Sequence, residues 1–119
     1  MNAAELLVAM QQDESKFQLH VNDFVDEFRR SSSFDRTRMV EPGPAENGAL
    51  EGLASAVVSA LCREVGMEAP AWVRSVHSPE PFFAFPARGF ALRLRLMLES
   101  PPPFLARNVF VPENYLSRA

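Results

Sequence analysis

The chain has 119 residues, 47% of them hydrophobic and 23% charged, which is the composition of one globular domain and excludes general disorder. The net charge of −3 is uneven, because residues 1–60 carry ten acids and five bases (−5), while residues 61–119 carry five acids and seven bases (+2). A membrane span is not expected, since no apolar run reaches ~20 residues. A signal peptide is not expected because the start of the sequence lacks basic residues, and one cysteine cannot form an internal disulfide. These features favour a cytoplasmic protein that does not bind membranes.

The stretch before the first proline is expected to be helical. Asn2 followed by Glu5 indicates a capping box at the start of a helix. Farther along, apolar residues at helical spacing form one stripe, which consists of Phe17, Val21, Phe24, Val25 and Phe28. We expect either one long helix or two helices, the second capped by Asp13 or Ser15. Together they make residues 1–34 an acidic, helical N-terminal segment.

A loop and then the clearest helix of the chain are expected next. Residues 35–48 hold two prolines, two glycines and an asparagine, which predicts a loop. Asn47 is the expected N-cap of the following core helix. The broad apolar face of that helix contains Leu50, Leu53, Ala54, Val57, Val58, Leu61, Cys62 and Val65. Gly66 stands where a left-handed C-cap belongs, and Met67 can supply the hydrophobic contact that follows it.

Proline and phenylalanine dominate the next part of the chain. Pro70 is expected to begin a short helix that continues through Trp72 and Val73. Residues 77–86 contain three prolines and three phenylalanines, which predicts an irregular loop fixed to the core by its aromatic rings.

The segment from residue 90 to residue 98 is ambiguous, because apolar residues occupy every second position, as in a strand. We predict a helix, since none of these residues is β-branched and only residues 109–111 could form a partner strand. Short helices are expected near residues 101–107 and 113–118. The predicted fold is therefore one all-α domain over residues 1–119, a small bundle of five to seven helices.

Few side chains are spaced as in catalytic or metal sites. His20, Asp23 and Glu27 share a helix face, but no second set of ligands accompanies them, so a solvated acidic face is expected. Cys62 lies on an apolar face, which favours a structural thiol over a catalytic pair with His20 or His77. We therefore predict no enzyme, no cofactor and no metal. A small enzyme without a recognisable motif remains an alternative.

Residues 61–76 have a layout similar to a helix-turn-helix, with Gly66 at the turn and apolar residues on both sides. A DNA-binding regulator is therefore a second alternative, and its contact residues would be Arg63, Arg74 and Ser75. The second helix offers few basic side chains to a groove, so nucleic acid is not the expected partner.

Phenylalanine and arginine indicate where a protein partner would bind. Ten phenylalanines exceed what one small core easily hides, so some of them could mark a contact surface or could simply fix the loop. The most basic stretch of the chain contains Arg88, Arg93, Arg95 and Arg107. These arginines could contact phosphate or an acidic partner, or they could lie on solvated helix faces. The candidate partner-binding residues are Phe82, Phe83, Phe85, Arg88, Arg93, Arg95 and Arg107. We predict a protein-interaction or regulatory module that binds a protein partner. The chain could also form a homodimer. Its acidic N-terminal helix face would suit a basic partner.

A set of features occurs together in the C-terminal part of residues 49–119: Pro70-Ala-Trp72, Phe82 and Phe83, residues 92–99 followed by Ser100-Pro101, Phe104, residues 107–111 and residues 116–119. In these features the chain resembles a family of short, uncharacterised bacterial helical proteins. The resemblance covers about the last 50 residues and implies a helical fold without a known activity. Some members lie near toxin–antitoxin or regulatory genes, so the resemblance implies an antitoxin-like role. It assigns no catalytic residue.

Overall fold

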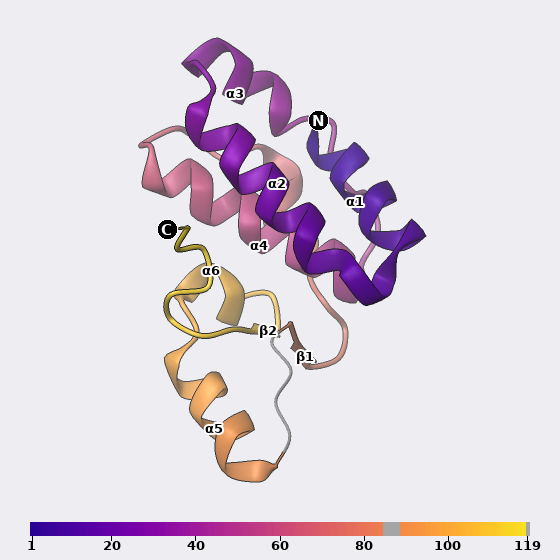
Figure 1. Ribbon diagram of the computed structural model, residues 1–119, viewed down its shortest axis with the longest axis vertical. Coiled ribbons are helices and arrows are strands. Elements are labelled where there is room, and N and C mark those ends of the chain that lie inside the picture. The colour runs from indigo at the N-terminus through magenta and orange to yellow at the C-terminus, as the bar shows by residue number, and fades with distance from the viewer. Residues whose placement is uncertain (85–88, 119) are drawn as a thin grey trace.

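The computed structural model describes residues 1–84 and 89–118, and in this part of the chain it contains six α-helices and one pair of very short strands (Figure 1). This confirms the predicted all-α fold of five to seven helices. The molecule is elongated, with extents of 43 × 26 × 25 Å. Helices α1 to α4 form one end of it, and α5 lies at the opposite end (Figure 1).

Two helices and a short connection form the N-terminal segment. They are α1 (Ala3–Gln12), the 3₁₀ helix η1 (Glu14–Lys16) and α2 (Phe17–Arg30). The predicted capping box is present, since the backbone N–H of Glu5 donates to Oδ1 of Asn2 and the backbone N–H of Asn2 donates to Oε1 of Glu5, both over 2.9 Å. The chain breaks where expected, but α2 starts after Lys16, and the side chain of Asp13 makes no capping hydrogen bond. The predicted caps at Asp13 and Ser15 are therefore wrong.

The apolar stripe of α2 faces the core as predicted. Val21, Phe24, Val25 and Phe28 are buried, and Phe17 is half-buried. Helix α2 packs against both α1 and α4.

A helix occupies the beginning of the predicted loop over residues 35–48, and that part of the prediction is wrong. Helix α3 spans Ser33–Met39, and its N-cap is Ser32, whose Oγ accepts the N–H of Asp35. Its last residue, Met39, is buried together with Val40. Helix α3 has no long apolar stripe, and it is defined by its N-cap, by the burial of Met39 and by two hydrogen bonds from Arg36 to backbone carbonyls of α2.

Helix α4 (Ala49–Glu64) is the central core helix that the sequence predicted. Every residue from 52 to 58 is buried, and α4 packs against α1, α2, η2 and α6. The expected C-cap is present, because Gly66 has φ of +71° and the N–H of Met67 donates to Cys62 O over 2.9 Å. The expected N-cap is wrong, since Asn47 Oδ1 accepts the N–H of His77 instead.

Two segments far apart in the chain form the small sheet. The 3₁₀ helix η2 (Ala71–Arg74) lies where a short helix was expected, and strand β1 (Phe82–Phe83) follows it. Strand β1 pairs in parallel with β2 (Val109–Phe110). The predicted loop over 77–86 therefore contains a strand, and its last two residues lie outside the described part of the chain.

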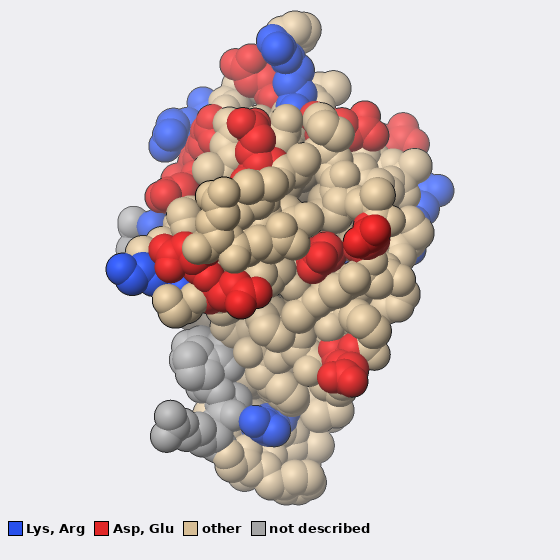
Figure 2. Space-filling view, turned by 90° about the vertical axis from the view of Figure 1, so that its right-hand side faces the viewer, with Lys and Arg blue, Asp and Glu red and all other residues tan. Residues whose placement is uncertain are grey.

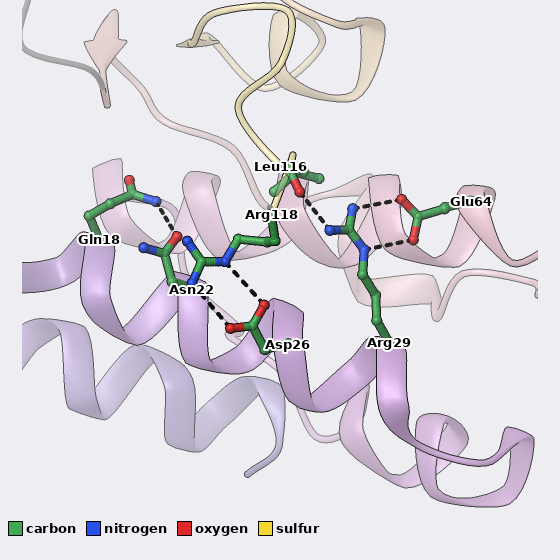
Figure 3. A network of polar contacts seen from close by, with 7 residues as sticks. All are labelled: Gln18, Asn22, Asp26, Arg29, Glu64, Leu116 and Arg118. Carbon is green, nitrogen blue, oxygen red and sulfur yellow. Dashed lines mark hydrogen bonds and ion pairs between the residues drawn. The ribbon is translucent and has the colours of Figure 1, made fainter.

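The C-terminal part contains α5 (Phe90–Glu99) and α6 (Pro102–Leu105). The helix predicted for residues 90–98 is confirmed, and the one predicted to reach residue 107 is shorter than expected. The helix predicted for residues 113–118 is wrong. This segment forms turns, because its polar groups are bonded across the molecule to α2 rather than along a helix (Figure 3). Within the described ranges, no helix is long and apolar enough to cross a membrane.

Candidate protein-interaction surface

Helix α5 is attached to the rest of the molecule by one buried side chain. Leu96 is the single buried residue of α5, and it packs against Phe110 and the half-buried Phe83. The rings of Phe83 and Phe110 lie 5.1 Å apart. These three residues form a small cluster separate from the main core.

A buried serine fixes the C-terminal end of α5. The Oγ of Ser100 accepts the N–H of Val111 over 2.9 Å and lies 3.0 Å from the carbonyl oxygen of the same residue. On the other side of the same segment, the N–H of Ala84 donates to Phe110 O over 3.2 Å. The segment that carries α5 is thus bonded at both ends to two consecutive residues, Phe110 and Val111.

The side of α5 that these contacts leave open carries large apolar side chains. Phe90 is 82% exposed and Leu98 is 76% exposed, and Leu94 and Met97 are each more than 40% exposed. With the exposed Ala91 they occupy one helical face, which we name the α5 stripe: Phe90, Ala91, Leu94, Met97 and Leu98. Roughly 500 Å² of largely apolar surface is exposed there, a size at which patches commonly mark interaction sites.

Hollows run along both sides of α5. One has a volume of about 550 Å³ and is lined by Pro81 and Phe83 together with α5 side chains. The other, of about 900 Å³, lies between α5 and residues 112–117. On the face of the molecule drawn in Figure 2, most charged side chains lie over the end formed by α1 to α4, which we call the body. The opposite end, which carries α5, has few charged side chains in this view.

The two arginines of α5 flank this apolar surface. The guanidinium carbon of Arg93 lies 5.2 Å from the ring centre of Phe83. Nε of Arg95 lies 2.9 Å from Oε1 of Glu99, and this hydrogen bond raises the pKa of Arg95. Of the predicted partner-binding residues, Phe83, Arg93 and Arg95 therefore lie together at α5.

The other predicted partner-binding residues lie elsewhere. Phe82 is half-buried against the main core, with its ring centre 5.9 Å from that of Phe17, so it fixes β1 in place. Phe85 and Arg88 lie outside the described residues. The predicted partner-binding residues include none of the five residues of the α5 stripe. The sequence pattern that could have indicated the stripe is a helix with apolar residues on every side, which is typical of a helix that is buried or docked.

Arg107 has a structural position. Its Nη1 donates to Pro103 O and its Nη2 to Val73 O, each over 2.8 Å, and its Nε–H is shared between Val73 O and Ser55 Oγ. Burial lowers the pKa of Arg107. The side chain joins α4, η2 and α6 and does not extend into a partner site.

The residues of the DNA-binding alternative are exposed, but the second helix predicted for that unit is only the short 3₁₀ helix η2. Arg63 lies on the surface of α4, and Arg74 and Ser75 lie at the end of η2. The η2 helix has four residues, too few to form a recognition helix. The indole N–H of Trp72 donates to Val40 O over 2.8 Å, which holds this segment against the rest of the molecule.

The candidate catalytic and metal-binding residues remain separate. Nε2 of His20 lies 4.0 Å from Asp13, and Glu27 binds the N-terminal amine over 3.2 Å. Cys62 is buried, and burial raises the pKa of its thiol to about 11. His77 is exposed. Among residues 1–84 and 89–118, no three His, Cys, Asp or Glu side chains are grouped so that they could hold a metal ion.

Part of the acidic face of α2 is neutralised within the molecule (Figure 3). Asp26 pairs with Arg118 over 3.1 Å, and this hydrogen bond lowers the pKa of the Asp26 carboxyl. Next to it, Arg29 binds both carboxylate oxygens of Glu64 and also the carbonyl oxygen of Leu116. These contacts fix the C-terminal turns to α2 and α4.

Comparisons of the chain with protein-family models, with curated proteins and with solved structures found no match. The resemblance of the C-terminal residues to bacterial helical proteins therefore stays a prediction.

Proposed function

We propose that this protein is an interaction module that binds a protein partner through the α5 stripe. The observation that supports the proposal is the exposure of Phe90 and Leu98 on a helix whose single buried side chain is Leu96. Water-exposed apolar side chains on one helical face gain free energy when a partner covers them. A helix held by so few intramolecular contacts is suited to docking against a second protein.

The experiment compares two leucine variants in cells that produce this protein. Leu94→Asp places a charge in the middle of the α5 stripe, whereas Leu19→Asp places the same charge at an exposed position of α2, away from α5. In an affinity purification, the tagged wild type and tagged Leu19→Asp should each retain a stoichiometric protein partner. An untagged copy of this chain counts as such a partner. Leu94→Asp should lose it, because the buried carboxylate would be desolvated without a partner charge.

Circular dichroism and thermal unfolding serve as the control for folding. Neither leucine belongs to the buried core, since Leu19 is 57% and Leu94 is 42% exposed, so both variants should keep the wild-type helical spectrum. If Leu94→Asp is folded and retains every partner of the wild type, the proposal is wrong. It is equally wrong if Leu19→Asp loses the same partner.

A further inference from the structure

From the symmetry of the α5 stripe, we infer that its partner is a second copy of this chain, bound by antiparallel pairing of the two α5 helices around a two-fold axis at Leu94. This inference rests on the proposed function, since it names the occupant of the same surface. Three observations carry it: the spacing of the stripe residues, the position of α5 in the molecule and the area that the stripe exposes.

The spacing of the stripe is symmetric about Leu94. Two residues precede Leu94 by four and three positions, and two follow it by three and four. A two-fold axis at Leu94 therefore places Phe90 against Leu98 of the second copy. It also places the small Ala91 against the long Met97 of the second copy. Such reciprocal contacts between unlike residues are the property of an isologous interface, and large residues facing small ones allow the helices to approach closely.

The position of α5 favours the antiparallel arrangement. Helix α5 lies at one end of the long axis, and its C-terminal end leads back towards the body (Figure 1). In an antiparallel pair, each body lies beyond the N-terminal end of the other copy's α5, so the two bodies are at opposite ends of the dimer. A parallel pair would place both bodies on the same side, where they would compete for space.

The exposed area is sufficient for a weak dimer. Two stripes together bury roughly 1,000 Å², which is the lower limit for specific interfaces between proteins. The hollow lined by Pro81 and Phe83 adjoins the stripe and offers further apolar surface. We therefore expect a dimer that dissociates on dilution.

The apolar character of the interface predicts its response to salt. The α5 stripe contains no charged residue, so added salt should not weaken self-association. Binding of an acidic protein to the arginines of α5 would instead weaken with salt.

The first test is the mass of the whole chain in solution as a function of concentration. Sedimentation equilibrium should show a shift from 13.3 kDa towards twice that mass, with Leu19→Asp behaving as the wild type. Leu94→Asp should remain monomeric over the same range, because two like charges would face each other on the axis. A wild type that is monomeric at every concentration overturns the inference.

The second test reads the register of the pair through single introduced cysteines. Cys62 is buried and gives little background. Leu94→Cys should form a cross-linked dimer on mild oxidation, and Phe90→Cys should cross-link with Leu98→Cys when the two are mixed. Phe34→Cys, at a 70% exposed position of α3, is the matched control and should stay uncrosslinked. Preferential cross-linking of Phe90→Cys with itself overturns the antiparallel arrangement.

The two proposals fail in different ways. If the chain is monomeric but captures another protein in a Leu94-dependent manner, the second copy is excluded as the partner and the proposed function stands. If neither self-association nor capture depends on Leu94, both are overturned.

Discussion

Arg107 donates its Nε–H to the Oγ of Ser55 over 2.7 Å, although the two residues are 52 positions apart in the chain. The same guanidinium donates to the carbonyl oxygens of Val73 and Pro103. One side chain therefore satisfies polar groups from three separate segments, which gives it a larger role in stability than any exposed arginine has.

Replacing Arg107 should destabilise the fold. Arg107→Met keeps much of the side-chain volume but removes the side-chain donor to Pro103 O and leaves Val73 O with the hydroxyl of Ser55 as its remaining side-chain donor. We expect the free energy of unfolding to fall by about 2–3 kcal/mol, measured by urea denaturation. The control Arg74→Met alters an exposed arginine and should change it by less than about 0.5 kcal/mol. Equal effects of the two substitutions would contradict the structural role of Arg107.

Gly52 is needed for close packing of α4. A Cβ atom at this position would lie 2.5 Å from the backbone nitrogen of Ser78 and 2.9 Å from the carbonyl carbon of His77. Gly52→Ala should therefore lower the free energy of unfolding by about 1–3 kcal/mol, even though alanine is the better helix former. Thermal unfolding measures the change, and Ser59→Ala on the same helix provides a half-buried control. A Gly52→Ala protein as stable as the wild type would show that this approach is not close.

The contacts of Arg29 predict a local effect at the C-terminal turns. Its Nη1 donates to Leu116 O over 2.7 Å while the rest of its guanidinium binds Glu64 (Figure 3). Because this ion pair is partly exposed, Arg29→Ala should lower overall stability by only about 0.5–1 kcal/mol. Amide hydrogen exchange in residues 113–118 should become faster. The neighbouring variant Arg30→Ala should leave that exchange unchanged, and faster exchange in both variants would argue against a specific role of Arg29.

The single tyrosine predicts an alkaline transition. Burial raises the pKa of Tyr115 well above its ordinary value, and the hydroxyl of Tyr115 donates a hydrogen bond to Gln18. Since the pKa is higher in the folded state, the stabilising contribution is complete below pH ~10 and is lost as the pH rises above that value. The near-ultraviolet absorbance of tyrosinate should therefore appear only together with unfolding.

The Tyr115→Phe variant is the control for this transition. Its stability should decline less steeply above pH ~10. A smaller decline should remain, because the pKa of Cys62 is also raised, to about 11. Ionisation of Tyr115 at its ordinary pKa in the folded protein would contradict its burial.

Elements with a long apolar period could be predicted from the sequence, and elements defined by single contacts could not. The helices over residues 17–30 and 49–64 carry many apolar side chains on one face, so their burial follows from local spacing. Helix α3 depends on the cap at Ser32, on burial of Met39 and on hydrogen bonds from Arg36 to the end of α2. Pairing of β1 with β2 likewise depends on a contact between distant segments.

The candidate surface could be predicted only in part for the same reason. The helical spacing of Phe90, Leu94 and Met97 is visible in the sequence, but an apolar face normally indicates a core contact. Which face of α5 meets the body is decided by Leu96 and Phe110, and nothing local to α5 distinguishes Leu96 from the other leucines. The structural position of Arg107 could not be predicted, because the sequence does not show that the carbonyl groups of Val73 and Pro103 lie next to it.

Ala84 is bonded to Phe110 and Ser100 to Val111, so two consecutive residues of the C-terminal part hold the described residues on either side of α5. The outward residues of α5 contribute little to the main core. Substitutions at these positions should therefore cost little folding stability. Under the proposed function, the partner that α5 selects could change while the main core stays the same.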